Sequence, residues 1–248
     1  ITLKRTGGWD LALGYSMFTN YMHDGFDYNN IEKSLDAQKI IVRGENNGSN
    51  TSFEDTQHIV IDGGCVPSVT ETGEGTVAAA YSISYSDNSH IGRNQCFRAQ
   101  CGTTSLTNVT IQNFCTTANG IVSVVRSNAP ECKSSVKVDL EHCWLDHNVG
   151  AYPGFYLCYA ANLYTGTSTP PTITIKNSKL SNSYANNTPT GAIRSISGTV
   201  CNLVMENSII ESNYGGGVRW QSTNACTARF TNCTIKGNKT FISDGNIA

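Results

Sequence analysis

Short runs of alternating apolar and polar residues recur along this chain. Each run leads to a polar residue, and Ile or Leu follows three residues later. The five clearest copies are SLTNVTI, VDLEHCWL, ITIKNSKL, LVMENSII and ARFTNCTI. Alternation with a period of two is typical of a β-strand, whose successive side chains point to opposite faces. The pattern therefore predicts repeated short strands.

The polar residue of each copy, which we call the anchor, recurs at intervals that suit a solenoid. From Asn108 onward the intervals are 34, 35, 30 and 25 residues, and TQHIVIDG provides an earlier copy. We interpret the anchors as structural, with Asn108 and Asn232 turned inward. The anchors are His58, Asn108, His142, Asn177, Asn207 and Asn232.

A second polar position follows three residues after the Ile or Leu of each copy. It is Asn148, Asn213 and Asn238 in three copies, with Ser183 and Phe114 in two others. A buried turn leaves backbone groups to satisfy, and a stacked side-chain amide can bond both within its own repeat and to the next one.

Another apolar run comes after a turn rich in small residues in four copies: NGIVSVV, PGFYLCY, TGAIRSI and GGGVRWQ. Glycine reaches backbone angles that branched residues cannot, so its recurrence marks corners between sheets. We expect an all-β fold, a right-handed parallel β-helix.

The runs IESNYGGGV and LSNSYANNTPTGAI resemble the repeat of the polymorphic outer-membrane protein family. That repeat has an aromatic-x-x-Asn element before Gly-Gly-Ala and an aliphatic residue. Here Ile or Leu replaces the aromatic residue, and residues 191–193 come nearest to the Gly-Ala-Ile core. The resemblance covers about residues 106–242 and implies a parallel β-helix of the surface adhesin type.

The chain is expected to form one domain over residues 1–248, because no linker or break in composition divides it. Residues 1–50 depart from the repeat and are dense in aromatic residues, including Trp9, Tyr15 and Phe18. We interpret them as an irregular N-terminal cap or first coil, with stacked coils over residues 51–248. The far end has no matching polar cap.

Composition narrows the classes of function. Charged residues make up 15% of the chain and the net charge is -2, so nucleic acid is not an expected partner. The sequence contains no run of 18 or more apolar residues, so it predicts no membrane-spanning helix within this stretch. The chain starts at Ile1, which we interpret as a processed product or a segment of a longer protein. We expect a secreted or cell-surface location.

Ten cysteines favour disulfides in an exported protein, because none shows the paired spacing of a zinc site. Cys201 and Cys226 each lie six residues before an anchor, while Cys65 and Cys115 each lie seven after one. Equivalent positions in neighbouring coils are close enough for a bridge. We predict Cys201–Cys226 and Cys65–Cys115, with reduced buried thiols as the alternative.

Six Asn-x-Ser/Thr sites agree with export, and two of them are anchors. The other four, which we expect to be glycosylated in a source that modifies its exported proteins, are Asn47, Asn50, Asn186 and Asn238.

One segment, CWLDHN, resembles the Trp-Ile-Asp-His segment of pectate lyases, which implies a calcium ligand at Asp146. No companion aspartate pair or Arg-x-x-Arg accompanies it. We therefore interpret Asp146 as a solvated turn residue, with a metal role as the alternative. No cofactor is predicted.

The expected function is a secreted structural or adhesive module that associates end to end with other copies or neighbouring β-helix segments. A polysaccharide lyase or glycoside hydrolase is the alternative, and enzyme activity is left open. A glycan-binding adhesin is a third class, because a row of tyrosines suits stacking on sugars. The row comprises Tyr156, Tyr159, Tyr164, Tyr184 and Tyr214.

Overall fold

The structure is a computed structural model of the 248-residue chain. It describes residues 2–3, 18–20, 39–44, 59–62, 67–72, 80–85, 97–99, 103–125, 137–158, 172–185, 192–195, 201–220 and 227–239. The described part is all-β and contains no helix. No segment of it is therefore a helix that is long and apolar enough to cross a membrane.

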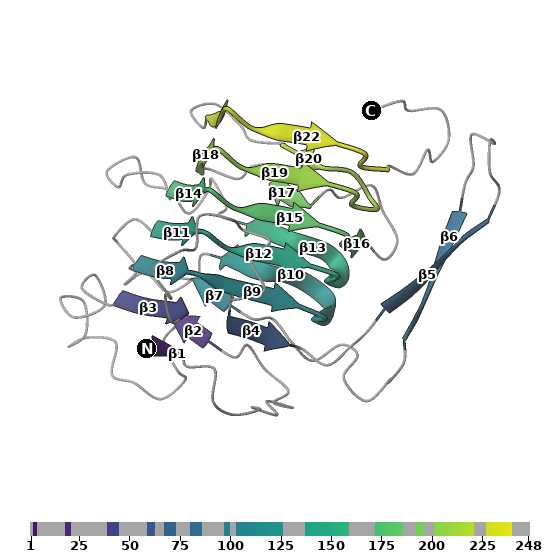
Figure 1. The fold of residues 1–248 in the computed structure, drawn as a ribbon, viewed down its shortest axis with the longest axis horizontal. Coiled ribbons are helices and arrows are strands. Elements are labelled where there is room, and N and C mark those ends of the chain that lie inside the picture. Colours follow the sequence, from purple (N-terminus) through teal and green to yellow (C-terminus); the bar gives the residue numbers. More distant parts are fainter. Residues whose placement is uncertain are drawn as a thin grey trace.

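Three parallel sheets form the main body (Figure 1). The first sheet consists of β1 (Thr2–Leu3), β3 (Lys39–Gly44), β8 (Thr103–Thr107), β11 (Lys137–Glu141), β14 (Thr172–Lys176), β18 (Asn202–Glu206) and β21 (Ala228–Thr231). The second sheet consists of β4 (Ile59–Asp62), β9 (Val109–Gln112), β12 (Trp144–Asp146), β15 (Lys179–Ser181), β19 (Ile209–Glu211) and β22 (Thr234–Lys236).

The third sheet consists of β2 (Phe18–Asn20), β7 (Phe97–Ala99), β10 (Cys115–Val125), β13 (Val149–Cys158), β17 (Ile193–Ser195) and β20 (Val218–Arg219), with β16 (Tyr184–Ala185) also paired to β13. A separate antiparallel hairpin, β5 (Pro67–Thr72) with β6 (Ala80–Tyr85), projects away from the stack (Figure 1).

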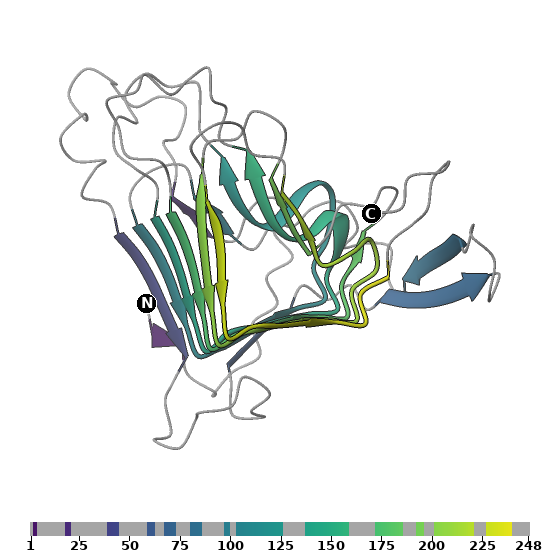
Figure 2. The same ribbon diagram turned by 90° about the horizontal axis from the view of Figure 1, so that it is seen from above.

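Successive strands along the chain visit the first, second and third sheets in turn. For example, β8, β9 and β10 are followed by β11, β12 and β13, and each strand pairs with its equivalent in the next set. We call one such set a repeat. Seen along the stack, the repeats overlie one another on three sides (Figure 2). Parallel strand pairing therefore joins each of these repeats to the next.

The inward side chains stack in columns that form the core. Leu106, Leu140 and Ile175 are in register in the first sheet, and Leu145 and Leu180 in the second. All five are at most 1% exposed. Stacking like on like keeps the interior close-packed from repeat to repeat. The alternation in the sequence thus corresponds to the inward and outward faces of the strands.

Five of the anchors form the sharp corner between the first and second sheets, and His58 lies outside the described residues. Asn108, His142, Asn177, Asn207 and Asn232 all have φ between 48° and 55°. This left-handed conformation is costly for most L-residues, and asparagine tolerates it best. Asn108 is buried, whereas Asn232 is exposed rather than turned inward, because its side chain lies at the outer surface of the corner, where its Nδ2 donates to Asn207 Oδ1 at 2.8 Å.

The second polar position forms an internal ladder at the next corner, as predicted. Asn213 Nδ2 donates to the Leu180 carbonyl at 3.1 Å and to Asn238 Oδ1 at 2.8 Å. Its Oδ1 accepts from the Ser183 backbone N–H at 3.1 Å. Asn148 binds the repeat before it in the same way, through the Ile111 carbonyl and the Phe114 N–H. The expected bonding between stacked repeats is confirmed.

A further ladder, at the residue after each anchor from His142 onward, was not predicted. Ser178 Oγ donates to the Lys176 carbonyl at 2.6 Å and accepts from the Cys143 N–H at 3.1 Å. Ser208 does the same for the Glu206 carbonyl and the Ser178 N–H. The sequence signal was the small polar residue in NSK and NSI, which directly follows the anchor.

The strand β3, within the segment interpreted as a cap or first coil, pairs with β8 in the first sheet. One feature differs from the sequence interpretation. The hairpin of β5 and β6 is an antiparallel insertion that the repeat pattern did not reveal. Most of residues 1–50, including Trp9 and Tyr15, lie outside the described residues.

Candidate functional site

The outward face of the second sheet carries a column of polar residues at the last position of each strand. In register, the column runs Asp62, Gln112, Asp146, Ser181, Glu211 and Lys236. Carboxylates therefore alternate with side chains that donate hydrogen bonds. Equivalent residues on paired strands are about 4.8 Å apart, and like charges at that separation would repel.

Asp146 is the centre of the most connected cluster in this column. Its Oδ1 accepts from Ser181 Oγ at 2.8 Å and from Asn182 Nδ2 at 2.9 Å, and its Oδ2 is 2.6 Å from His147 Nδ1. Asp146 lies in β12 and is 6% exposed. The interpretation of Asp146 as a solvated turn residue was wrong, because the strand of the second sheet begins directly after the anchor turn.

Hydrogen bonding sets the charge state of this cluster. Burial alone would raise the pKa of Asp146, but hydrogen bonds from His147, Ser181 and Asn182 outweigh it and lower that pKa below the ordinary value of 3.8. The hydrogen bond to Asp146 raises the pKa of His147 above 6.5, against the opposing effect of its burial. The two groups therefore stabilise each other as an ion pair.

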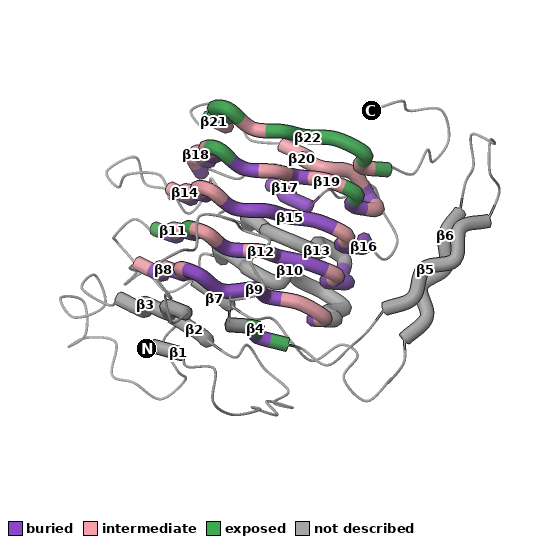
Figure 3. Tube along the Cα trace, viewed as in Figure 1, coloured by how far each residue is buried: buried purple, intermediate pink, exposed green. Residues whose placement is uncertain are grey.

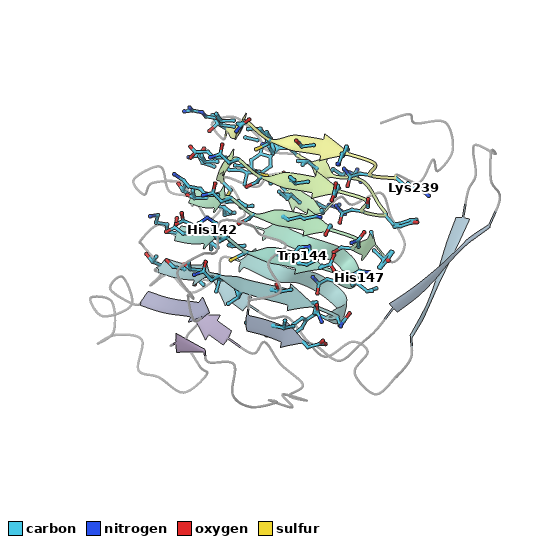
Figure 4. The ribbon with its side chains drawn as sticks, viewed as in Figure 1. His142, Trp144, His147 and Lys239 are labelled. Carbon is cyan, nitrogen blue, oxygen red and sulfur yellow. The ribbon has the colours of Figure 1, made fainter. Side chains whose placement is uncertain are left out.

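The repeat next to that of Asp146 contains a buried lysine, Lys179, that forms an ion pair. Lys179, 6% exposed, lies with its Nζ 5.4 Å from the Trp144 ring centroid and 2.7 Å from Glu211. Lys236 also contacts Glu211 at 3.1 Å. The hydrogen bond from Lys179, with that from Lys236, lowers the pKa of Glu211 against a small effect of burial. Figure 4 shows Trp144 and His147 at opposite ends of β12, with His142 beyond its start.

This arrangement is poorly suited to acid–base chemistry on a polysaccharide. Glycoside hydrolysis needs one carboxyl group whose pKa is raised so that it can donate a proton. Asp146 and Glu211 both have lowered pKa values and are bonded to donors. Ser181 Oγ donates to Asp146 and accepts from Trp144 Nε1 at 2.7 Å. The hydrogen of the Ser181 hydroxyl group therefore points to Asp146 and not to a histidine.

The described residues offer no further ligands for a metal ion at Asp146. No group of three His, Cys, Asp or Glu side chains there is arranged to hold an ion. Both oxygens of Asp146 are already used by Ser181, Asn182 and His147. His142 and His147, five residues apart, lie at two different corners of the repeat, each with a positive φ.

A second feature is the open edge, which we define as the outer edge of β21 and β22. These strands pair with β18 and β19, and neither has another neighbour among the described residues. Phe230 and Ile235 continue the inward columns of Met205 and Ile210, yet they are 36% and 50% exposed. The last described repeat is the exposed end of the stack in Figure 3. It presents both apolar side chains and strand edges.

The cysteine predictions stay predictions. Cys201 is buried and its Sγ lies 3.6 Å from the Asn202 carbonyl, but Cys226 lies outside the described residues. Cys115 begins β10, and Cys65 is also outside them. The ladder offsets, 25 residues from Leu203 to Ala228 and 50 from Ile59 to Val109, equal the separations of the two predicted pairs.

Cys143 is a free buried thiol that was not assigned from the sequence. Its Sγ is within 3.4 Å of the Leu106 carbonyl and 3.3 Å of the Glu141 carbonyl. Burial raises the pKa of this thiol to about 12, despite opposing backbone hydrogen bonds. It therefore packs as part of the corner ladder, at the position that serine occupies in the next two repeats.

Asn238 is poorly placed as a glycosylation acceptor. Its Nδ2, the atom that would carry the glycan, donates to the Ile210 carbonyl at 3.0 Å inside the corner. A glycan there would break the ladder that Asn238 Oδ1 forms with Asn213. The other three candidates, Asn47, Asn50 and Asn186, lie outside the described residues.

The tyrosine row is described only in part. Tyr184 and Tyr214 stack with ring centroids 5.2 Å apart, and Lys239 Nζ lies 5.2 Å from the Tyr214 ring. Tyr184 is 9% exposed, which leaves little of its face for a sugar. For Tyr156 the structure describes the backbone in β13, and Tyr159 and Tyr164 lie outside the described residues.

Comparison with protein-family models, with curated proteins and with solved structures finds no match to this chain. The resemblance to the polymorphic outer-membrane repeat therefore rests on the sequence motifs, and the structure supports the coarser statement of parallel strands in stacked sheets.

Proposed function

We propose that the chain forms a right-handed parallel β-helix that acts as a structural or adhesive module, secreted to a cell surface or an extracellular fibre. Its open edge adds to another copy or to a neighbouring β-helix segment. The observation that carries this proposal is the exposure of Phe230 and Ile235 on strands that lack a described outer neighbour. Such an edge is a template for strand pairing.

The two ends of the second sheet differ in a way that supports a directional contact. Ile61, inward on β4 at the far end, is 6% exposed, whereas Ile235 in the same column is 50% exposed. Apolar surface is therefore left open at one end only of this column. Association at that end would remove it from water, which is favourable by about 25 cal/mol per Å² of apolar surface.

The polar side chains of the outward face favour a structural role over catalysis. Asp62 is bonded to Gln112 and Asn113, Asp146 to Ser181 and Asn182, and Glu211 to two lysines. Each carboxylate is thus used to join repeats. A lyase or hydrolase would instead keep carboxylates from neighbouring repeats together at a groove.

Sedimentation velocity over a range of concentrations tests the role of the open edge. We expect the wild-type chain to associate and the variant Phe230→Gln/Ile235→Gln to remain monomeric, because both side chains lie on the proposed contact. The matched control is Val60→Gln, since Val60 is 51% exposed and apolar but lies on β4 at the other end of the sheet.

Equal association of the double variant and the wild type would contradict the proposal. So would a wild-type chain that stays monomeric at every concentration. Circular dichroism of each variant would establish that the stacked strands are retained.

A further inference from the structure

The last described repeat, Ala228–Lys239, is basic. It contains Arg229, Lys236 and Lys239 and no aspartate or glutamate. All three side chains are exposed. Lys236 contacts Glu211 of the previous repeat and Lys239 lies over the Tyr214 ring, yet the Lys236 side chain is still 64% exposed at the last described repeat. The open edge therefore combines positive charge with the apolar side chains Phe230 and Ile235.

Opposite charges or donor–acceptor pairs occupy neighbouring repeats in two outward columns, whereas the exposed Arg229 follows Val204 in its own column. In the first sheet Lys176 lies between Glu141 and Glu206 in register and contacts Glu206 at 3.0 Å. In the second sheet Glu211 lies between Ser181 and Lys236. Continuing this pattern past Lys236 requires an acceptor in the next position of the column.

We propose that the open edge docks a parallel strand repeat of a partner protein that carries carboxylates in the columns of Arg229 and Lys236. This inference rests on the proposed function and specifies the chemistry of its partner. The contact adds one strand to the first sheet and one to the second, with aliphatic residues over Phe230 and Ile235.

The open edge of a second copy does not meet this description. Two such edges brought face to face would bring Arg229, Lys236 and Lys239 of one copy near the same three residues of the other, and like charges at a contact are destabilising. The preferred partner is therefore acidic, and the contact joins two different surfaces.

One internal repeat of this chain has the required composition. In register, Asp139 shares the column of Arg229, and Asp146 shares the column of Lys236. Leu140 and Leu145 share the inward columns of Phe230 and Ile235, and Asn148 belongs to the same ladder as Asn238. A peptide with this sequence is therefore a rational probe of the open edge.

The experiment measures binding of the peptide KVDLEHSWLDHNV, residues 137–149 with Cys143→Ser, to the full 248-residue chain by fluorescence anisotropy. The comparison peptide, KVNLQHSWLNHNV, replaces the three carboxylates with amides. We expect the amide peptide to bind about tenfold more weakly, the effect of losing the two charge pairs with Arg229 and Lys236.

The variant Arg229→Gln/Lys236→Gln should abolish this preference, while Lys137→Gln, an exposed lysine on β11, should leave it unchanged. Equal binding of the two peptides, no binding of either, or equal binding of a scrambled peptide with the same acidic residues would overturn the inference.

The outcomes separate this inference from the proposed function. If the chain associates but shows no preference for the acidic peptide, the inference on partner charge fails and the structural role stands. If the acidic peptide binds as expected while the chain stays monomeric, self-association fails, and the open edge is a docking surface for another protein.

Discussion

One asparagine in each of several repeats satisfies backbone groups of its neighbours at a closed corner. Asn213 is fully buried, and it bonds the Leu180 carbonyl, the Ser183 N–H and Asn238. Both backbone groups lie inside the stack, where water cannot replace the lost partner. The cost of removing this side chain is therefore set by the groups left unpaired.

We predict that Asn213→Ala lowers the free energy of unfolding by about 2–5 kcal/mol, because two buried backbone groups lose their partner. Chemical denaturation monitored by circular dichroism would measure the change. Asn207→Gly is the control, since it removes one exposed side-chain bond, from Asn232 Nδ2 at 2.8 Å, while glycine keeps the positive φ of the turn. A loss at position 213 no larger than at position 207 would refute the ladder's role.

The anchors make a different prediction, because their requirement is conformational. Asn177 has φ 48°, which glycine adopts freely and a β-branched residue does not. We expect Asn177→Gly to be nearly neutral and Asn177→Val to cost about 2 kcal/mol or more. Thermal unfolding of both variants checks the order, and equal losses would show that the side chain matters more than the turn.

The ion pair of Asp146 and His147 predicts a pH dependence. The lowered pKa of Asp146 adds stability above pH 3.8 that disappears as the pH falls through its folded value. The raised pKa of His147 adds stability below pH 6.5 that disappears as the pH rises through its folded value. The pair therefore contributes most between these two values.

His147 is 44% exposed at its side chain, so we expect the contribution to be below about 1 kcal/mol. Unfolding at pH 5.5 and pH 8.5 should show a loss for the wild type on raising the pH that His147→Gln lacks. An identical pH dependence in the two proteins would show that the pair contributes nothing to stability.

At the scale of elements, the sequence revealed the strands whose alternation is long enough to see. β14 shows the inward residues Ile173 and Ile175 between partly exposed positions, and the strands after the glycine turns were also anticipated. The three-residue strands of the second sheet were missed. β12 has one inward aliphatic residue, Leu145, so no period of two is visible.

The polar column of the second sheet could not be derived from one repeat at a time. Asp146, Ser181 and Glu211 come from three distant copies of the pattern, and their contacts depend on the register of the ladders. The burial of Lys179 likewise follows from Glu211 and Trp144 in adjacent repeats. The alternation in the sequence predicts which residues face inward. The contacts between outward residues can be predicted only when the register of the stacked strands is known.

The alternation of charge in this column predicts the effect of a misplaced carboxylate. Ser181→Asp would set three acidic residues in consecutive strands and remove a hydrogen bond to Asp146. We expect a loss of stability of about 1–3 kcal/mol at pH 7 that shrinks toward pH 4, because the two neighbouring carboxylates raise the pKa of the introduced carboxyl group and it becomes protonated first. Ser181→Asn is the neutral control, and a pH-independent loss would argue against charge repulsion.

At the scale of the whole molecule, the last described layer, β21 and β22, continues the pattern of the stack without a described layer beyond it. Inward columns, corner ladders and outward pairs all continue from one repeat to the next until β21 and β22, where Phe230 and Ile235 are exposed. The same interactions that hold the repeats together are therefore available to a partner at that layer. Assembly by addition of strands is the functional use of this geometry that we propose.

Electron microscopy of the undenatured protein at high concentration is the most direct test of this claim. We predict filaments in which the open edge of one copy meets a different surface of the next, with strands about 4.8 Å apart along the axis. The variant Phe230→Gln/Ile235→Gln should give separate short rods. Separate rods from the wild type, or particles joined side by side through the outward faces, would contradict the account.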